Sequence, residues 1–157
     1  MPGEALLIGI ATIAVVIAGF TAITSGLAPA SGAWDRGQRI RQRAIVSTSF
    51  NVTFESLAAL IVFAALNDER TSLVLASAGV ATYTLAVVVV RGRQMLRAGA
   101  FAGRSARVLF VLGPLACLLF AANALVFVSV GVYALALCLQ LSVAAISFYT
   151  LVSSASS

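Results

Sequence analysis

The chain has 157 residues, of which 61% are hydrophobic and only 10% are charged, and its mean hydropathy is +1.07. An ordinary soluble domain has about 25% charged and about 45–50% apolar residues, so this chain lacks the polar residues that would cover a water-exposed surface. The composition therefore excludes a soluble globular protein and predicts one integral membrane domain.

The net charge of +5 comes from ten arginines and five acidic residues, because the chain has no lysine and no histidine. In a soluble protein this excess would suggest nucleic acid binding. Here the arginines lie mainly in two short segments between apolar runs, which is typical of a membrane topology signal, and no nucleic acid partner is predicted. The bias toward Ala, Val and Arg indicates a GC-rich bacterial genome, so we expect the protein in a bacterial plasma (inner) membrane.

Five apolar segments are long enough to cross a bilayer as helices, since about 20 apolar residues cover the hydrocarbon core. The last two segments share a stretch from Val108 to Val152 that carries no charge and is too long for one span. We expect the turn between Leu125 and Gly131, where polar and small residues interrupt the apolar pattern. The runs do not alternate apolar and polar residues as a transmembrane β-barrel would, so the predicted fold is an all-α helix bundle. The predicted spans are residues 5–27, 44–66, 71–90, 108–126 and 132–152.

The arginines also predict the orientation of the bundle. They lie between the first and second spans and again between the third and fourth, whereas the other two connections are net negative or uncharged. Arg-rich loops stay in the cytoplasm, which places the N-terminus outside and the C-terminus in the cytoplasm. Some of these arginines are candidate contacts for lipid headgroups, including anionic ones, although simple cytoplasmic anchoring is enough to explain them. These residues are Arg36, Arg39, Arg43, Arg91, Arg93 and Arg97.

One polar stripe runs along the second span. Ser47, Thr48, Asn51 and Glu55 share one helical face because steps of three and four residues return to the same side. An ionised carboxylate at bilayer depth costs about 3 kcal/mol or more, so Glu55 is expected to face protein or water and to be protonated or hydrogen-bonded. Two interpretations remain open: Glu55 is a functional group, as in an ion or proton relay, or it is a neutral group that joins helices.

Other polar residues fall at about the same depth as Glu55. Gln140 lies near the middle of the fifth span, and Thr82 and Tyr83 lie near the middle of the third. If these side chains converge, they form a buried polar site, although any five-helix bundle contains some polar residues. The candidate intramembrane polar site is Glu55, Asn51, Thr48, Gln140, Thr82 and Tyr83.

Catalytic chemistry has few candidate residues in this chain. It lacks histidine and lysine, and Cys117 and Cys138 form no CxxC pair. No catalytic residue, metal site or cofactor is therefore predicted. Small residues recur at helix-packing spacing, as at Ala14, Ala18 and Ala22, which allows close contact with another helix of the chain, another membrane subunit or a second copy.

The layout resembles small, uncharacterised bacterial multi-pass proteins of five helices to which no activity is assigned. The resemblance rests on the arginine-rich segment RGQRIRQR, on the STSF sequence that follows it, and on a pattern in the last third of the chain. That pattern is Asn123-Ala124-Leu125, then Tyr133, Leu135 and Leu137, then Phe148 and Leu151. The resemblance implies a five-helix membrane fold and no mechanism.

Two functions are consistent with these features. The first is a non-enzymatic membrane component, either a scaffold or an accessory subunit of another complex. The alternative is a small oligomeric channel or transporter that uses Glu55 with Gln140 and the Thr82–Tyr83 region. Five helices without an internal repeat are few for an alternating-access transporter, so the first function is preferred.

Overall fold

The computed structural model describes residues 3–27, 36–97 and 104–155, with side chains described within 3–23, 42–93 and 111–150. These residues form five α-helices and no strand, which confirms the predicted all-α class. By length and composition, α1, α2, α3 and α5 could each cross a membrane, and the apolar part of the remaining helical segment, Val111–Phe127, is shorter. The helices are α1 (Glu4–Leu27), α2 (Arg36–Leu66), α3 (Glu69–Arg97), α4 (Arg104–Ala122), the π-helical turn η2 (Asn123–Phe127) and α5 (Val130–Ala155).

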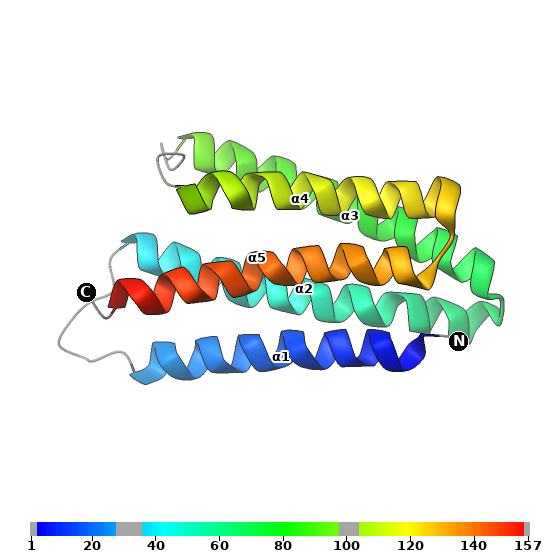
Figure 1. The fold of residues 1–157 in the computed structure, drawn as a ribbon, viewed down its shortest axis with the longest axis horizontal. Helices are drawn as coiled ribbons and strands as arrows, with labels where there is room; N and C mark the ends of the chain where they lie inside the picture. The colour runs from blue at the N-terminus through cyan, green and yellow to red at the C-terminus, as the bar shows by residue number, and fades with distance from the viewer. Residues whose placement is uncertain (1–2, 28–35, 98–103, 156–157) are drawn as a thin grey trace.

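Four helices form a ring, and α1 packs on the outside of it (Figure 1). Going around the ring, α2 contacts α3, α3 contacts α4, α4 contacts α5, and α5 contacts α2. Helix α1 lies against α2 and α5. The pair α2–α3 therefore has one side that faces the ring interior and one side that faces outward.

The two ends of the bundle differ in which helix termini they hold (Figure 1). The start of α1, the α2–α3 turn and the α4–α5 turn lie at one end. The end of α1, the start of α2, the end of α3, the start of α4 and the end of α5 lie at the other. We call this second end the arginine end, because the helix termini that border both Arg-rich segments lie there.

The helices extend further into the Arg-rich segments than the predicted spans do. Helix α2 begins at Arg36, eight residues before the predicted span, and α3 does not stop at Arg91 but continues to Arg97. The segment RGRQMLR contains mainly strong helix formers and no proline, so nothing in it ends the helix. The arginines at these positions thus belong to the first turns of α2 and the last turns of α3.

The α2–α3 connection is a two-residue turn. Asn67 has a positive φ of 51°, and its N–H donates to the carbonyl of Phe63, which is the left-handed termination common at helix ends. Asp68 then caps α3, since its Oδ2 accepts from the N–H of Thr71 at 3.1 Å. These two short polar residues explain why two long helices pack antiparallel with almost no loop.

Asn123 organises the turn between α4 and α5. Its carbonyl accepts from the N–H of Val128, its Oδ1 accepts from the N–H of Ser129, and its Nδ2 donates to Ser77 of α3. Val128 takes the left-handed conformation, with a φ of 46°, and breaks the helix there. This break lies in the interval in which the sequence predicts a turn. Asn123 is fully buried, so its bonds to the turn and to α3 fix the start of α5.

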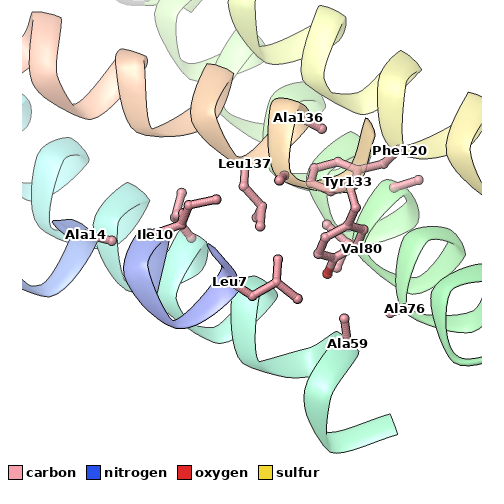
Figure 2. Packing of buried hydrophobic residues seen from close by; sticks show 13 residues of the cluster. Leu7, Ile10, Ala14, Ala59, Ala76, Val80, Phe120, Tyr133, Ala136 and Leu137 are labelled. Carbon is pink, nitrogen blue, oxygen red and sulfur yellow. The ribbon is translucent and has the colours of Figure 1, made fainter. Parts of the chain in front are cut away.

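The core lies between the ring helices and the inner face of α1 (Figure 2). Phe120 and Tyr133 meet edge to face with ring centroids 5.2 Å apart, and both side chains are fully buried. Leu7 and Ile10 bring α1 against this cluster. Most of the remaining buried hydrophobic residues are alanines, which let the helix backbones approach closely, as expected for a bundle that packs in lipid.

Candidate functional site

The inner side of the α2–α3 interface holds a carboxyl group bonded across three helices. Glu55 of α2 is 5% exposed, and its Oε1 accepts from the Thr84 hydroxyl of α3 at 3.5 Å. The same hydroxyl oxygen accepts from the Gln140 amide of α5 at 3.1 Å. Glu55 and Gln140, which the sequence placed at one depth, are thus joined through Thr84.

Two further features surround Glu55. The Tyr133 hydroxyl of α5 donates to the backbone carbonyl of Glu55 at 2.5 Å, which adds a second link between α2 and α5. The other carboxyl oxygen, Oε2, is buried and has no hydrogen-bond partner among the described residues. A buried polar atom without a partner is uncommon and costs about 1–3 kcal/mol, so Oε2 is a candidate contact for a proton, a water molecule or a ligand.

A second polar pair lies on the outer side of the same interface. The Tyr83 hydroxyl donates to Oδ1 of Asn51 at 2.9 Å, and Tyr83 is 48% exposed. Thr82 points outward as well and donates to the carbonyl of Ala78 in its own helix. Thr82 therefore takes no part in the buried network around Glu55.

Arg91 forms the third polar link between α2 and α3. Its guanidinium donates to the hydroxyl of Thr48 at 3.0 Å and to the hydroxyl of Ser47. Thr48 and Asn51 therefore bond to different residues of α3, and neither side chain is hydrogen-bonded to Glu55. The polar stripe predicted on α2 exists, but it is divided among three separate partners.

Three residues of α3 that bond to other helices follow a seven-residue spacing. One face of α3 carries Arg91, Thr84 and Ser77, since seven residues make almost two full turns. Arg91 bonds to α2, Thr84 bonds to α2 and α5, and Ser77 bonds to Asn123. Sequence reasoning missed Thr84, Ser77, Tyr133 and Asn123 as members of the network. The spacing of Arg91, Thr84 and Ser77 was the available signal, whereas Tyr133 and Asn123 gave no comparable one.

The six arginines that are candidate lipid contacts lie near the arginine end, and the structure describes the side chains of three of them. Arg43 and Arg93 are exposed at the arginine end, and Arg91 is half-buried between α2 and α3. Arg36 and Arg39 lie in the first turns of α2, and Arg97 is the last residue of α3, but their side chains lie outside the described residues.

An apolar groove runs along the outer side of the α2–α3 interface, with a volume of about 480 Å³. All its lining residues belong to α2 and α3, so the groove opens sideways from the bundle and not along its axis. The lining residues are Asn51, Phe54, Glu55, Ala58, Val62, Leu75, Ala76, Gly79, Val80 and Tyr83.

Comparisons with protein-family models, with curated proteins and with solved structures found no match to this chain. The resemblance to small bacterial multi-pass proteins therefore stays a prediction. Function has to be argued from the hydrogen-bonded network and the groove.

Proposed function

We propose that this protein is a non-enzymatic component of a bacterial inner membrane, acting as a scaffold or accessory subunit. The observation that carries this proposal is the linkage of Glu55, Thr84 and Gln140, which joins α2, α3 and α5 at the centre of the bundle. Polar groups committed to helix–helix bonds stabilise a bundle, and each such bond contributes about 0.6–2 kcal/mol. A rigid bundle with mostly apolar outer faces is suited to packing beside other membrane subunits.

The proposal includes a topology of five spans with the N-terminus outside and the C-terminus in the cytoplasm. Its support is the Arg-rich sequence that borders the helix termini at one end of the bundle. Single cysteines at Gly37 or Gly99 should resist a membrane-impermeant thiol reagent in intact cells, whereas a cysteine at Asn67 should react. Cys117 and Cys138 are replaced in the background, and Gly99 lies outside the described residues. Labelling at Gly99 from outside would exclude this orientation.

The alternative is a small oligomeric channel or transporter, and one observation favours it. The Oε2 atom of Glu55 is buried without a partner among the described residues, which leaves one carboxyl oxygen available for a proton or an ion. The sideways opening of the groove argues against an axial pathway within one copy of the chain. A pathway would have to form between copies.

Substitution of Glu55 separates the two functions. If the carboxyl only joins helices, Glu55→Gln should leave stability and ion flux in reconstituted vesicles unchanged, because an amide has a similar shape and hydrogen-bonding capacity. If Glu55 must gain and lose a proton, Glu55→Gln should abolish proton flux without harming folding, because an amide cannot titrate. Gln140→Glu, which adds a second carboxyl to the same network, serves as a comparison.

The accessory-subunit proposal would be wrong if wild-type vesicles carried a proton flux that Glu55→Gln removes. It would be supported if wild type and Glu55→Gln were equally silent in flux while Glu55→Leu lowered the stability of the folded protein. Leucine lacks every hydrogen-bonding group that the network requires.

A further inference from the structure

The outer groove between α2 and α3 has the shape of a site for a flexible hydrocarbon chain. Its walls include small side chains such as Ala58 and Ala76, and a Cβ built at Gly79 would meet nothing within 4 Å. The groove volume of about 480 Å³ falls in the range of about 300–1,000 Å³ that is common for small-molecule sites. Because the groove opens toward the lipid side of the bundle, it can be entered from the bilayer.

A cationic site lies on the same helix pair at the arginine end. Arg91 donates to Ser47 and Thr48, which hold its guanidinium between α2 and α3. A guanidinium carries five N–H donors, so after these two bonds three donors remain. Arg43 is exposed and lies one helical turn from Ser47 on the same face of α2. Among the described residues, no acidic side chain forms an ion pair with either arginine.

The groove and the cationic site lie in line along α2 and α3. Going away from Arg91, the bond from Tyr83 to Asn51 joins the two helices again, and both of these residues line the groove. At a rise of about 1.5 Å per residue, Tyr83 lies about 12 Å below Arg91, and Leu75 lies about 12 Å further. The guanidinium itself is bonded to Thr48, however, and along α2 the groove residues Asn51 and Ala58 lie only about 5 Å and about 15 Å from Thr48. The hydrocarbon layer of one leaflet is about 15 Å thick, so a chain anchored at this guanidinium reaches Ala58 in the groove.

We propose that one anionic phospholipid binds along the α2–α3 pair, with its phosphate at Arg91 and Arg43 and one acyl chain in the groove. Charge complementarity selects this occupant: the cationic site recognises a phosphate at the membrane surface, and the groove below it is lined mainly by apolar residues. A transmembrane helix of a partner would fill the groove without using the arginines. The proposal goes beyond the accessory role and does not depend on the function of Glu55.

The chain itself supplies matched pairs of variants. Arg91→Gln removes the proposed phosphate contact, and Arg93→Gln makes the same charge change about 200° around the helix on the face opposite Arg91. Gly79→Leu fills the groove, and Gly19→Leu makes the same change at an exposed glycine of α1 that also has nothing within 4 Å. Arg43→Gln changes an exposed side chain and breaks no hydrogen bond among the described residues, so it tests the phosphate contact even if Arg91→Gln folds poorly.

The test uses the full chain purified in mild detergent, with bound lipid counted by native mass spectrometry during titration with dioleoyl-phosphatidylglycerol. We expect one lipid per chain at low lipid concentration. Arg91→Gln and Arg43→Gln should each weaken binding about fivefold, since an arginine near an anionic headgroup contributes about 1 kcal/mol. Gly79→Leu should weaken binding about tenfold, because the acyl chain loses at least two buried methylenes. Arg93→Gln and Gly19→Leu should bind as wild type.

Comparison ligands distinguish the sources of binding. Glycerol phosphate has the anion without the chain, dioleoylglycerol has the chains without the anion, and dioleoyl-phosphatidylcholine has no net charge. Equal binding of any one of these would overturn the proposal, as would equal losses in Arg91→Gln and Arg93→Gln. An effect of Gly79→Leu on oligomeric mass with no effect on lipid binding would assign the groove to a second protein helix and would also overturn it.

Discussion

Thr82 and Thr84 are the same residue type two positions apart on α3, yet they lie on opposite sides of the α2–α3 interface. Thr82 is exposed and donates to the carbonyl of Ala78 in its own helix. Thr84 is buried, donates to Glu55 of α2 and accepts from Gln140 of α5. Tyr83, between them, is half-exposed and bonds to Asn51 at the edge of the groove.

The difference shows how a bundle in lipid uses hydroxyl groups. Water is absent from the bilayer core, so each hydroxyl has to find a partner within the protein. A threonine on the outer side bonds to the carbonyl four residues earlier and contributes nothing between helices. A threonine on the inner side can join helices, because polar partners on α2 and α5 lie within reach. The side of the helix decides the role, and the residue type does not.

Packing gives the largest expected contrast between the two sides. Ala59 is fully buried in the core, whereas the preceding residue, Ala58, lines the outer groove. Ala59→Leu should lower the free energy of unfolding by about 2–3 kcal/mol, because extra carbons force a well-packed core to shift. Ala58→Leu should leave it nearly unchanged, since the added carbons enter an open groove. Unfolding in mixed micelles measures both.

Equal losses in the two alanine variants would mean that the groove is closed in the folded protein. In that case the distinction between an inner and an outer side would fail at this depth. A loss in Ala58→Leu alone would reverse the assignment of the two faces of α2.

The threonine pair gives the next largest contrast. Thr84→Val keeps the shape of the side chain but removes the links to Glu55 and Gln140, and it should cost about 1 kcal/mol. Thr82→Val should cost almost nothing, because the bond it removes lies within one turn of α3. The free energy of unfolding of the two variants, measured side by side, checks the difference.

A double variant tests whether Thr84 acts through Gln140. Combining Thr84→Val with Gln140→Leu should cost less than the sum of the two single variants, since the amide left unpaired by the first change is removed by the second. Strict additivity would show that the bond between Thr84 and Gln140 contributes nothing measurable to stability.

The sequence predicted the helices more completely than it predicted the site. The helical class followed from the apolar runs, and the turn after α2 followed from the polar residues around Asn67 and Asp68. The sequence did not predict that α2 begins at Arg36 or that α3 continues to Arg97. The apolar runs mark only the part of each helix that lies in lipid, whereas Arg, Gln and Leu favour a helix in water as well.

The site could be predicted only by depth. Depth along a helix follows from residue number, so the sequence could assign Glu55 and Gln140 to the same depth, and in the structure both bond to Thr84. Their connection depends on rotation of the helices and on which helices are neighbours, and Thr84 becomes visible only when α2, α3 and α5 are packed together. Thr82 was chosen for its depth, but rotation places it on the outer face.

The smallest expected effect concerns the hydrogen bonds between Thr71 and Asp68, which are exposed to water. They serve as a reference for the hydrogen bonds on the inner and outer sides of the α2–α3 interface. Asp68 is exposed in the α2–α3 turn, where hydrogen bonds from the Thr71 hydroxyl and then from the Thr71 backbone N–H hold the pKa of its carboxyl below its usual value. A carboxyl whose pKa is lower in the folded state stabilises the fold above its usual pKa of about 4, and this contribution disappears as the pH falls through the lowered pKa. Asp68→Asn retains a capping side chain that does not titrate. The stability difference between wild type and Asp68→Asn should therefore be constant from pH 7 to pH 5 and then shift against wild type as the pH falls toward 3. Unfolding in mixed micelles at each pH measures this difference.

Thr71→Val, which removes the hydroxyl donor but keeps the backbone N–H, should reduce that shift. The same pH series on Thr82→Val and Thr84→Val should leave the order of stability of these two variants unchanged. A difference between wild type and Asp68→Asn that stayed flat down to pH 3 would mean that the cap contributes no more as a carboxylate than as an acid.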